Sequence, residues 1–514
     1  MGGGLNDTAE IKRLVNEQVE TERRALAIET EPEPSGNRIL EALARNEAGD
    51  AELFIERNRG RLIYDHAAGL WHIFKGHRWE PDITEQTLAW VADIADLYIK
   101  EMRRQAWARA GAEKAGNSKA ADAAAKLEKA IARRIRELHT VRRRQDILHL
   151  ARAGADTLGI SGDQWDTDSM SLAVQNGVID LRTGNRRDGK PEDYFKNFAP
   201  THWEDLDAPH PTFDAFLYGI FNGDLELIAF VQRLLGYIIT GKTTEAILPI
   251  LWGSGRNGKT VLLQAIADTL GSDLAGPLDG ELLLESRFRK QSGGPSSDLL
   301  YLRGKRLTWL SETNENRRLN SGKVKLLTGG DLITGRAPYA ARQITFKPTH
   351  KIFLLTNFKP HADAQDEALW RRVLLIPFDM AVVPNPDPEK PNERLADPDL
   401  PEKLKAERPG ILAWLVQGCL EWQRQGLNPP ETVMAATKEY QEAEDTLKAF
   451  LRDRCTEGPG RTVRAGVFYK SYQAWAEANG EKPITLNKFG RYMGNAFDYT
   501  SDEGGKCYIG IGLS

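Results

Sequence analysis

Residues 247 to 271 of the chain are ILPILWGSGRNGKTVLLQAIADTLG, and this stretch decides the fold. The phosphate-loop pattern G-x-x-x-x-G-K-[ST] is formed here by Gly253, Gly258, Lys259 and Thr260. The apolar run ILPIL before it is typical of a buried strand, and VLLQAIADTL after it has the spacing of a helix that stops at Gly271. The stretch therefore predicts a strand, a glycine loop and a helix, in that order.

The loop predicts a site for a nucleoside triphosphate. Glycines let backbone N–H groups point at phosphate oxygens, and the N-terminus of the following helix adds a partial positive charge. Lys259 is expected to reach the β- and γ-phosphates, and the hydroxyl of Thr260 is expected to bind Mg²⁺. The predicted binding residues are Gly253, Ser254, Gly255, Arg256, Asn257, Gly258, Lys259, Thr260 and Val261.

Length and composition narrow the class of protein. At 514 residues the chain is too long for one core, and about three or four domains are expected. The net charge of −4 means that any contact with DNA must come from local basic patches. Three cysteines far apart in the sequence indicate a reduced, cytoplasmic protein. No apolar run has transmembrane length and no signal peptide is recognisable, so no membrane partner is expected.

Alternating aromatic and polar residues over 60–82 predict a hairpin with Trp71 and Trp79 on one face. Residues 84–156 are rich in Ala, Glu, Lys and Arg and predict helices, interrupted at 115–120. Two basic clusters in these helices favour a solvated face over a DNA contact: Arg133, Arg134, Arg136 and Arg142, Arg143, Arg144. The Pro-rich stretch 383–409 is predicted to be a linker or a long loop.

Three segments after the loop supply candidate catalytic residues. KRLTWLSE predicts a strand that ends at Glu312, a carboxylate that can bind Mg²⁺ or polarise the attacking water. KIFLLTN predicts a strand followed by Asn357, whose amide can orient that water. ALWRRVLLIPF places Arg371 and Arg372 before a buried strand, where an arginine could serve a neighbouring subunit's nucleotide or simply be surface charge.

Residues 323–348 predict a helix end, a Gly-Gly turn and a hairpin. Positive charge beside an aromatic side chain suits contact with a single DNA strand, and a solvated hairpin is the alternative. The candidate DNA-binding residues here are Lys323, Lys325, Arg336, Tyr339, Arg342 and Lys347.

Taken together, these segments resemble the superfamily 3 helicases, and in particular the phage and plasmid primase-helicase family that includes the poxvirus primase-helicase. KVKLLTGGDLITGR is similar to its B-prime motif, TNFKP to its sensor-1 segment with Asn357 and Lys359, and WRR to its arginine-finger site. WHIFKGHRWEPD and NGVIDLRTG resemble the domain that precedes the helicase. The last sixty residues resemble a winged-helix module of that family, with Lys488 and Arg491 expected to face DNA together with Asn487 and Lys506.

The resemblance implies an α/β fold with an AAA+-like phosphate-loop ATPase core, an N-terminal α+β and helical domain, and a C-terminal winged-helix-like domain. The expected divisions are a charged arm (1–55), a pre-helicase domain (56–205), the ATPase core with its helical lead-in (206–385), a linker and helical segment (386–452) and the winged-helix-like domain (453–514). Only about 55 residues precede the matching region, too few for a primase domain, so no primer synthesis is expected.

The function implied is that of an ATP-dependent DNA helicase in phage or plasmid replication, with ATP and Mg²⁺ as cofactors. The resemblance further implies a homo-hexameric ring that moves 3′ to 5′ on single-stranded or forked DNA and works beside a separate primase or replication protein. Lys259, Glu312, Asn357, Arg371 and Arg372 are the expected catalytic residues, with Thr260 and Glu312 on Mg²⁺. The alternative is an origin-binding or helicase-loading module that ATP switches without unwinding; a DNA-packaging motor is a weaker third possibility.

Overall fold

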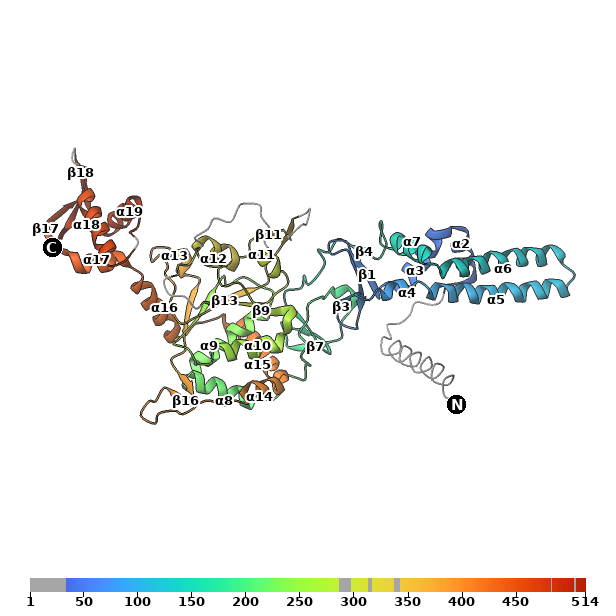
Figure 1. Cartoon of the computed structure of the whole chain (residues 1–514), viewed down its shortest axis with the longest axis horizontal. Coiled ribbons are helices and arrows are strands. Elements are labelled where there is room, and N and C mark those ends of the chain that lie inside the picture. Colours follow the sequence, from blue (N-terminus) through green and yellow to red (C-terminus); the bar gives the residue numbers. More distant parts are fainter. Residues whose placement is uncertain (1–33, 286–296, 313–316, 337–342, 482, 503–504) are drawn as a thin grey trace, which may run out of the picture. The chain divides into compact units, whose positions relative to one another are not determined.

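The computed structural model describes residues 34–514 except 286–296, 313–316, 337–342, 482 and 503–504. The chain divides into two compact units (Figure 1). The first contains the described part of Met1–Asp180 together with Asn185–Trp203, and the second contains Leu181–Gly184 and Glu204–Ser514. None of the described helices is both long enough and apolar enough to cross a membrane.

The first unit combines helices with two small sheets. Its helices are α2 (Gly36–Ala44), α3 (Asn46–Asn58), α4 (Gln86–Trp90), α5 (Asp93–Lys114), α6 (Ser118–Leu138) and α7 (Val141–Ala151). One sheet has the order β3-β2-β1-β4, formed by β1 (Leu62–Asp65), β2 (Leu70–Phe74), β3 (Trp79–Pro81) and β4 (Gly159–Ile160). The other contains β5 (Ser171–Val174), β6 (Gly177–Asp180) and β7 (Asn185–Arg187).

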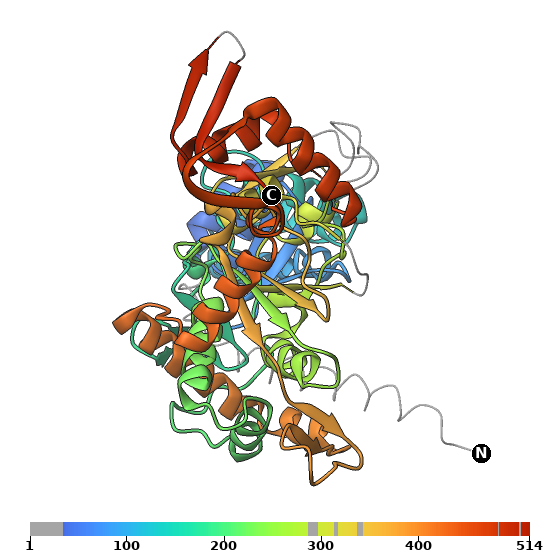
Figure 2. The same cartoon turned by 90° about the vertical axis from the view of Figure 1, so that its left-hand side faces the viewer.

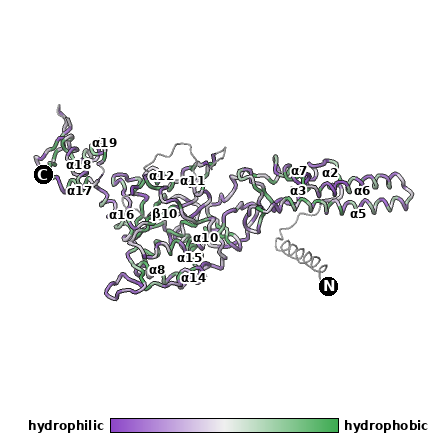
Figure 3. Tube along the Cα trace, viewed as in Figure 1, coloured by the Kyte–Doolittle hydropathy of each residue, from purple (hydrophilic) through white to green (hydrophobic). Residues whose placement is uncertain are grey.

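The predicted interruption of the helices is confirmed, because α5 and α6 form a helical hairpin with its bend at residues 115–117. The side chain of Asn117 caps α6 by accepting a hydrogen bond from the backbone N–H of Ala120. Hydrophobic and hydrophilic residues alternate along both helices (Figure 3). On α6 the buried positions Ala124, Ile131 and Leu138 are a heptad apart and lie on one face.

Two sequence-based expectations for this unit require correction. The predicted arm, 1–55, overlaps α2 and α3, whose residues Ile39, Leu53 and Phe54 are buried in the core of the unit; residues 1–33 lie outside the described residues. The hairpin of β1, β2 and β3 is present, but Trp71 and Trp79 are on opposite faces. Trp71 packs against the main core, and Trp79 belongs to a separate cluster. Directly paired residues share a face of the sheet, so Trp79 lies on the face of its partner Phe74. Trp71 is three positions from Phe74 along β2 and therefore lies on the opposite face.

The basic clusters of α6 and α7 are only partly a solvated face. Arg134 and Arg143 point inward, where their guanidinium groups lie 2.9 Å and 2.6 Å from the two carboxylate oxygens of Asp50. Asp50 is fully buried and also accepts a hydrogen bond of 2.6 Å from the hydroxyl of Tyr98. One carboxylate on α3 therefore ties α5, α6 and α7 together.

We expect Asp50→Ala to destabilise the first unit by about 3–5 kcal/mol, because two buried guanidinium groups would lose their shared counter-charge. Hydrogen exchange of the α3 and α7 amides in the full chain would measure this, since it reports on each unit separately. Arg133→Ala is the matched control: its side chain is 77% exposed, and its pair with Glu137 should contribute at most about 0.5 kcal/mol. Equal effects of the two substitutions would contradict the buried cluster.

The second unit is built on a five-stranded parallel sheet. Its strands are β8 (Leu248–Trp252), β9 (Ala275–Pro277), β10 (Leu307–Glu312), β13 (Lys351–Thr356) and β14 (Val373–Pro377), in the order β14-β8-β13-β10-β9. All of β13 and most of β8 and β14 are buried, which explains their continuous apolar sequences. The chain goes from β8 to the far edge, returns through β10 and β13, and then passes β8 to reach β14. The strand order therefore reverses beside β8, where ligands of open α/β sheets commonly bind.

Helices and short strand pairs surround this sheet. The helices are α8 (Pro211–Ile220), α9 (Leu225–Ile238), α10 (Lys259–Leu274), α11 (Ser297–Tyr301), α12 (Ser321–Thr328), α13 (Glu367–Trp370), α14 (Leu400–Ala406), α15 (Arg408–Gln425) and α16 (Glu431–Ala443). The strand pairs are β11 (Ile333–Gly335) with β12 (Ile344–Phe346), and β15 (Ala381–Val383) with β16 (Glu393–Leu395).

The predicted linker is part of this unit, because β16 and α14 form within it and α15 packs closely on α9. At that contact a Cβ on Gly236 would lie 2.1 Å from the backbone N of Cys419, and one on Gly418 would lie 2.1 Å from the carbonyl of Gln232. The two glycines therefore let the helix backbones approach. α16 in turn packs on β14, where the hydroxyl of Thr437 accepts a hydrogen bond from the backbone N–H of Leu375.

The C-terminal residues form a small group of helices and strands within the second unit. They comprise α17 (Thr446–Arg454), β17 (Cys455–Arg464), α18 (Ala465–Ala478), α19 (Leu486–Ala496), β18 (Tyr499–Asp502) and β19 (Gly505–Leu513). The sheet has the order β17-β19-β18, and β18 and β19 extend from it as a hairpin (Figure 2). Phe450, Phe468, Tyr472, Phe489 and Tyr508 are buried in its core.

Candidate functional site

The ends of four neighbouring strands meet at one edge of the parallel sheet. Trp252 of β8 pairs with Thr356 of β13 on one side and with Pro377 of β14 on the other, and Thr356 pairs with Glu312 of β10. The glycine loop after Trp252 therefore begins in the same row in which β10 and β13 end. The backbone of Glu312 lies in that row, and its side chain is outside the described residues.

The predicted glycine loop connects β8 to α10, as the sequence indicates. Gly255 and Gly258 have φ of +94° and +86°, and Arg256 between them also has a positive φ of +50°. A Cβ on Gly258 would lie 2.6 Å from Cγ2 of Ile220, and one on Gly253 would lie 2.4 Å from the carbonyl oxygen of Phe378. Glycine is therefore required at both ends of the loop for steric reasons, and at Gly258 also because of its positive φ.

The loop is anchored to the segment that follows β14. The side-chain amide of Asn257, which is 2% exposed, donates a hydrogen bond of 3.1 Å to the carbonyl of Phe378. The backbone N–H of Val382 donates to the carbonyl of Arg256 at 2.6 Å. Ser254 and Thr260 remain exposed, and the first turn of α10 starts directly after Gly258. The free N–H groups of a helix start beside an exposed glycine loop are suited to binding phosphate.

Lys259 is a buried cation at this edge. Only 6% of the residue is exposed, and its Nζ donates to the carbonyl of Gly253 at 2.7 Å and to Oδ1 of Asn357 at 3.2 Å. Burial lowers the pKa of its ammonium group to about 8. No carboxylate pairs with Lys259 among the described residues. The structure thus brings two predicted catalytic residues together, and it leaves a positive charge that an anionic ligand would stabilise.

The pKa of Lys259 predicts a dependence of stability on pH. The folded value of about 8 is below the usual value of 10.5, so between these limits the unfolded chain holds one more proton and stability rises with pH. Relative to Lys259→Met, the wild-type chain without nucleotide should gain on the order of 3 kcal/mol as the pH rises from 8 to 10.5. Thermal unfolding of both proteins across this range measures the difference. Parallel stability curves would contradict the buried, charged lysine.

The structure separates the two candidate arginines. Both follow α13, a single helical turn that begins at Glu367. The side chain of Arg371 is 77% exposed; its Nε donates a long hydrogen bond of 3.4 Å to the carbonyl of Glu367, and the carboxylate of Glu367 lies 3.9 Å from its guanidinium group. Arg372 is half-buried, and its Nη1 donates a hydrogen bond of 2.6 Å to the carbonyl of Ala368. Arg371 is therefore available to another molecule, whereas Arg372 fastens the end of its own helix.

Several candidate DNA-binding lysines are engaged within the protein. Lys325 pairs with Asp366 at 2.8 Å, Nζ of Lys323 donates to the carbonyl of Leu284 at 3.2 Å, and Lys488 pairs with Asp363. By contrast, Lys347 and Arg491 are exposed, and Arg336 is half-exposed. The predicted hairpin is formed by β11 and β12, while Tyr339 and Arg342 lie outside the described residues.

Sequence reasoning missed Asp366, which links two functional segments. Its Oδ1 caps α13 by accepting from the backbone N–H of Leu369, and its Oδ2 receives the ammonium group of Lys325. Partial burial would raise the pKa of Asp366, but hydrogen bonds from Lys325 and Leu369 hold it below its usual value. An aspartate directly before the short helical sequence EALW is a helix-cap signal that could have identified the first of these roles.

Known proteins resemble this chain over most of its length. Residues 51–222 match the family model described as "D5 N terminal like". The chain is 28% identical over 467 residues to "Putative helicase L207/L206" of Acanthamoeba polyphaga mimivirus, covering 86% of this chain and 47% of that protein. It is 26% identical over 334 residues to "Putative primase C962R" of African swine fever virus (strain Badajoz 1971 Vero-adapted), covering 61% of this chain and 34% of that protein. The apo structure of the NrS-1 C-terminal region has a TM-score of 0.46 and 10% identity, covering 91% of this chain and 99% of that chain.

The fold and site define an α/β protein with a glycine loop at the carboxyl edge of a parallel sheet. The matching family model and the viral relatives support a likeness to the D5-like primase-helicases, in agreement with the resemblance inferred from the motifs of the chain. The chain spans less than half the length of these two curated relatives.

Proposed function

We propose that the chain is an ATP-dependent DNA helicase of superfamily 3 type that acts in the replication of a phage, plasmid or viral genome. One observation carries the proposal: Lys259 is a buried ammonium group without a carboxylate partner in the described part of the chain, beside a glycine loop. The position of this loop at the reversal of strand order supports it further. A triphosphate bound there would neutralise the lysine.

The residues at this edge divide the expected tasks. Lys259 and the loop from Gly253 to Val261 would hold the phosphates, and Thr260 and Glu312 would hold Mg²⁺. Asn357, which contacts Lys259 at 3.2 Å, would orient the attacking water. Bound ATP supplies the free energy of phosphoanhydride hydrolysis. Arg371 would complete the nucleotide site of a neighbouring subunit in a homo-hexameric ring.

Two features of the fold support an AAA+-like core followed by a winged-helix-like module. Across the parallel sheet the strands lie in the order β14-β8-β13-β10-β9, which is 5-1-4-3-2 when these five strands are numbered along the chain. The glycine loop follows the first of them, β8. The C-terminal elements run helix, strand, two helices and a hairpin, and the sheet places the first strand beside the last. Asn487 and Arg491 are exposed on α19, and the ammonium group of Lys506 lies 3.4 Å from the ring centroid of Tyr499 on the hairpin. These residues are the proposed DNA contacts of the module.

The decisive experiment measures ATP hydrolysis with and without single-stranded DNA, together with strand displacement on a fork with a 3′ tail. DNA-stimulated turnover with displacement is the expected result. Turnover without displacement would favour the alternative, in which ATP switches an origin-binding or loading module. Absence of nucleotide binding would refute both. Native mass spectrometry with ATP would test the ring, and the same fork with a 5′ tail would test the expected 3′ to 5′ polarity.

The pairing of Lys325 with Asp366 predicts that Lys325 positions α13 rather than contacting DNA. Lys325→Ala and Asp366→Ala should lower ATP hydrolysis to a similar extent, and the double variant should lose little more, because both substitutions release the same helix. DNA affinity measured across salt concentrations discriminates the two roles. A lysine on a DNA phosphate would reduce the salt slope by about one when removed, whereas a positioning lysine would leave it unchanged. Lys347→Ala, which removes an exposed hairpin lysine, is the control for a true contact.

A further inference from the structure

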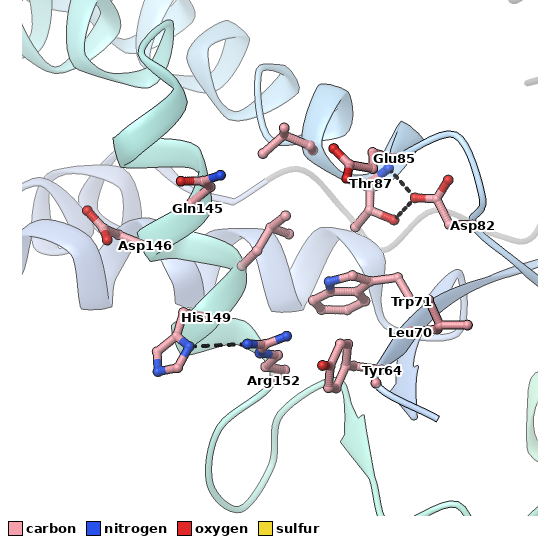
Figure 4. Close-up of a pocket in the computed structure, with 13 residues that line it drawn as sticks. Tyr64, Leu70, Trp71, Asp82, Glu85, Thr87, Gln145, Asp146, His149 and Arg152 are labelled. Carbon is pink, nitrogen blue, oxygen red and sulfur yellow. Dashed lines mark hydrogen bonds between the residues drawn. The ribbon is translucent and has the colours of Figure 1, made fainter. Parts of the chain in front are cut away.

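A cavity of about 530 Å³ lies within the first unit, in the region that matches the family model (Figure 4). The hairpin of β1 and β2, helix α4 and helix α7 surround it. Its volume is typical of sites for small molecules, which occupy roughly 300–1,000 Å³. No residue of the proposed ATP site lines it.

An aromatic platform occupies the middle of the cavity. Trp71 is half-buried, packs against the core of the unit, and meets Tyr64 edge-on with ring centroids 5.2 Å apart. Its indole reaches into the space between Arg152 and Thr87 (Figure 4). Among the described residues, the indole N–H of Trp71 has no hydrogen-bond partner. A large flat ring that is held on one side and open on the other is suited to stacking.

A positive charge lies on one side of this platform. The guanidinium carbon of Arg152 is 4.3 Å from the centroid of Tyr64, and its Nη2 is 3.4 Å from Nδ1 of His149 (Figure 4). Arg152 forms no ion pair with a carboxylate in the part of the chain that the structure describes. The contacts with Tyr64 and His149 therefore hold the cation in place without neutralising it.

A carboxylate and an amide lie on α7, about two turns before Arg152. Gln145 and Asp146 are exposed on α7, and neither has a partner among the described residues. Asp146 precedes Arg152 by six positions, which is about 9 Å along a helix. The carboxylate of Asp82 is already used, because it accepts from the backbone N–H groups of Gln86 and Thr87 and from the Thr87 hydroxyl. The cavity thus offers a ligand the ring of Trp71, the cation of Arg152 at one end, and the Asp146 carboxylate with the Gln145 amide at the other end.

We propose that this cavity binds a nucleotide, with its base stacked on Trp71, the amino edge of the base toward Asp146 and Gln145, and its phosphate at Arg152 and His149. A nucleotide combines a flat π face, exocyclic N–H donors and a negative charge at the far end, which matches all three features. A basic peptide would meet the free charge of Arg152, and an acidic one would meet Asp146. The ligand could be a free nucleotide or one residue of a single strand. This inference does not depend on the phosphate loop.

The test uses the full chain carrying Lys259→Ala, so that the phosphate loop contributes little to binding. One arm titrates a six-residue deoxyadenosine oligonucleotide with a central 2-aminopurine, whose fluorescence is quenched when it stacks. The other arm adds dAMP as competitor. Quenching that dAMP reverses would identify a free nucleotide as the ligand, and quenching that dAMP does not reverse would identify the strand. Absence of quenching would overturn the proposal.

Variants localise the effect. Trp71→Leu should weaken binding about 10-fold or more, as expected for loss of one stacked base. Trp107→Leu is the matched control, because this tryptophan is 83% exposed on α5 of the same unit. Asp146→Asn alters an exposed side chain and avoids any folding defect; it should reduce the preference for adenine and cytosine over thymine oligonucleotides. Equal binding by the two tryptophan variants, together with an unchanged base preference in Asp146→Asn, would overturn the proposal even if ATP hydrolysis proceeds as expected.

Discussion

Lys259→Ala is expected to lower ATP hydrolysis by at least about 100-fold, the loss typical of removing one preorganised positive group from a charged transition state. The structure gives the reason: Lys259 is 6% exposed, and its ammonium group is held by the carbonyl of Gly253 and by Asn357 at the carboxyl edge of the sheet. No other described lysine has these contacts. Phosphate release from the purified full chain at saturating ATP is the measurement.

The control for this substitution is Lys405→Ala, because Lys405 is exposed on α14 and pairs only with the neighbouring Glu402. It should hydrolyse ATP at the wild-type rate. The thermal unfolding of Lys259→Ala should show an intact second unit, since removal of a buried ammonium group relieves desolvation. Undiminished turnover in a folded Lys259→Ala protein would exclude the loop as the hydrolytic site.

The local structure around the glycine loop that the sequence predicts correctly is specified by residues close together in the chain. Gly253, Gly258 and Lys259 lie within seven consecutive residues, and the flanking apolar patterns specify a strand and a helix without reference to other segments. The proximity of Asn357 to Lys259 also follows from local features. KIFLLTN identifies a strand that ends at Asn357, and parallel strands end at the same edge of a sheet.

The parts that could not be predicted depend on pairs distant in sequence. Arg134 and Arg143 look like surface charge until Asp50, more than eighty residues earlier, is placed between them. Lys325 looks like a DNA contact until Asp366, 41 residues later, caps α13 beside it. The Pro-rich segment before α15 has the composition of a linker, yet its fold depends on packing against elements far away in the chain. Composition cannot show which charges are neutralised by tertiary contacts.

Arg371→Ala is expected to lower ATP hydrolysis by about 10³–10⁵-fold, the range for an arginine supplied to a neighbour's nucleotide. Its side chain is 77% exposed and is held only by a long hydrogen bond of 3.4 Å to the carbonyl of Glu367 and by the carboxylate of the same residue at 3.9 Å, so it can reach across a subunit interface. Arg372→Ala is the matched control, because Arg372 donates to the carbonyl of Ala368 and acts on its own helix. It should reduce turnover far less. The reverse order of the two effects would assign the finger to Arg372.

Mixing subunits tests whether Arg371 acts on a neighbour. A Lys259→Ala subunit has no working nucleotide site but retains Arg371, and an Arg371→Ala subunit has the opposite defect. In an equimolar mixture that exchanges subunits, about one interface in four joins an intact loop to an intact arginine, so hydrolysis should reappear although each variant alone is inactive. An arginine that served its own subunit's nucleotide could give no such recovery. Return of activity would therefore establish both the trans-acting role of Arg371 and the assembly that it requires.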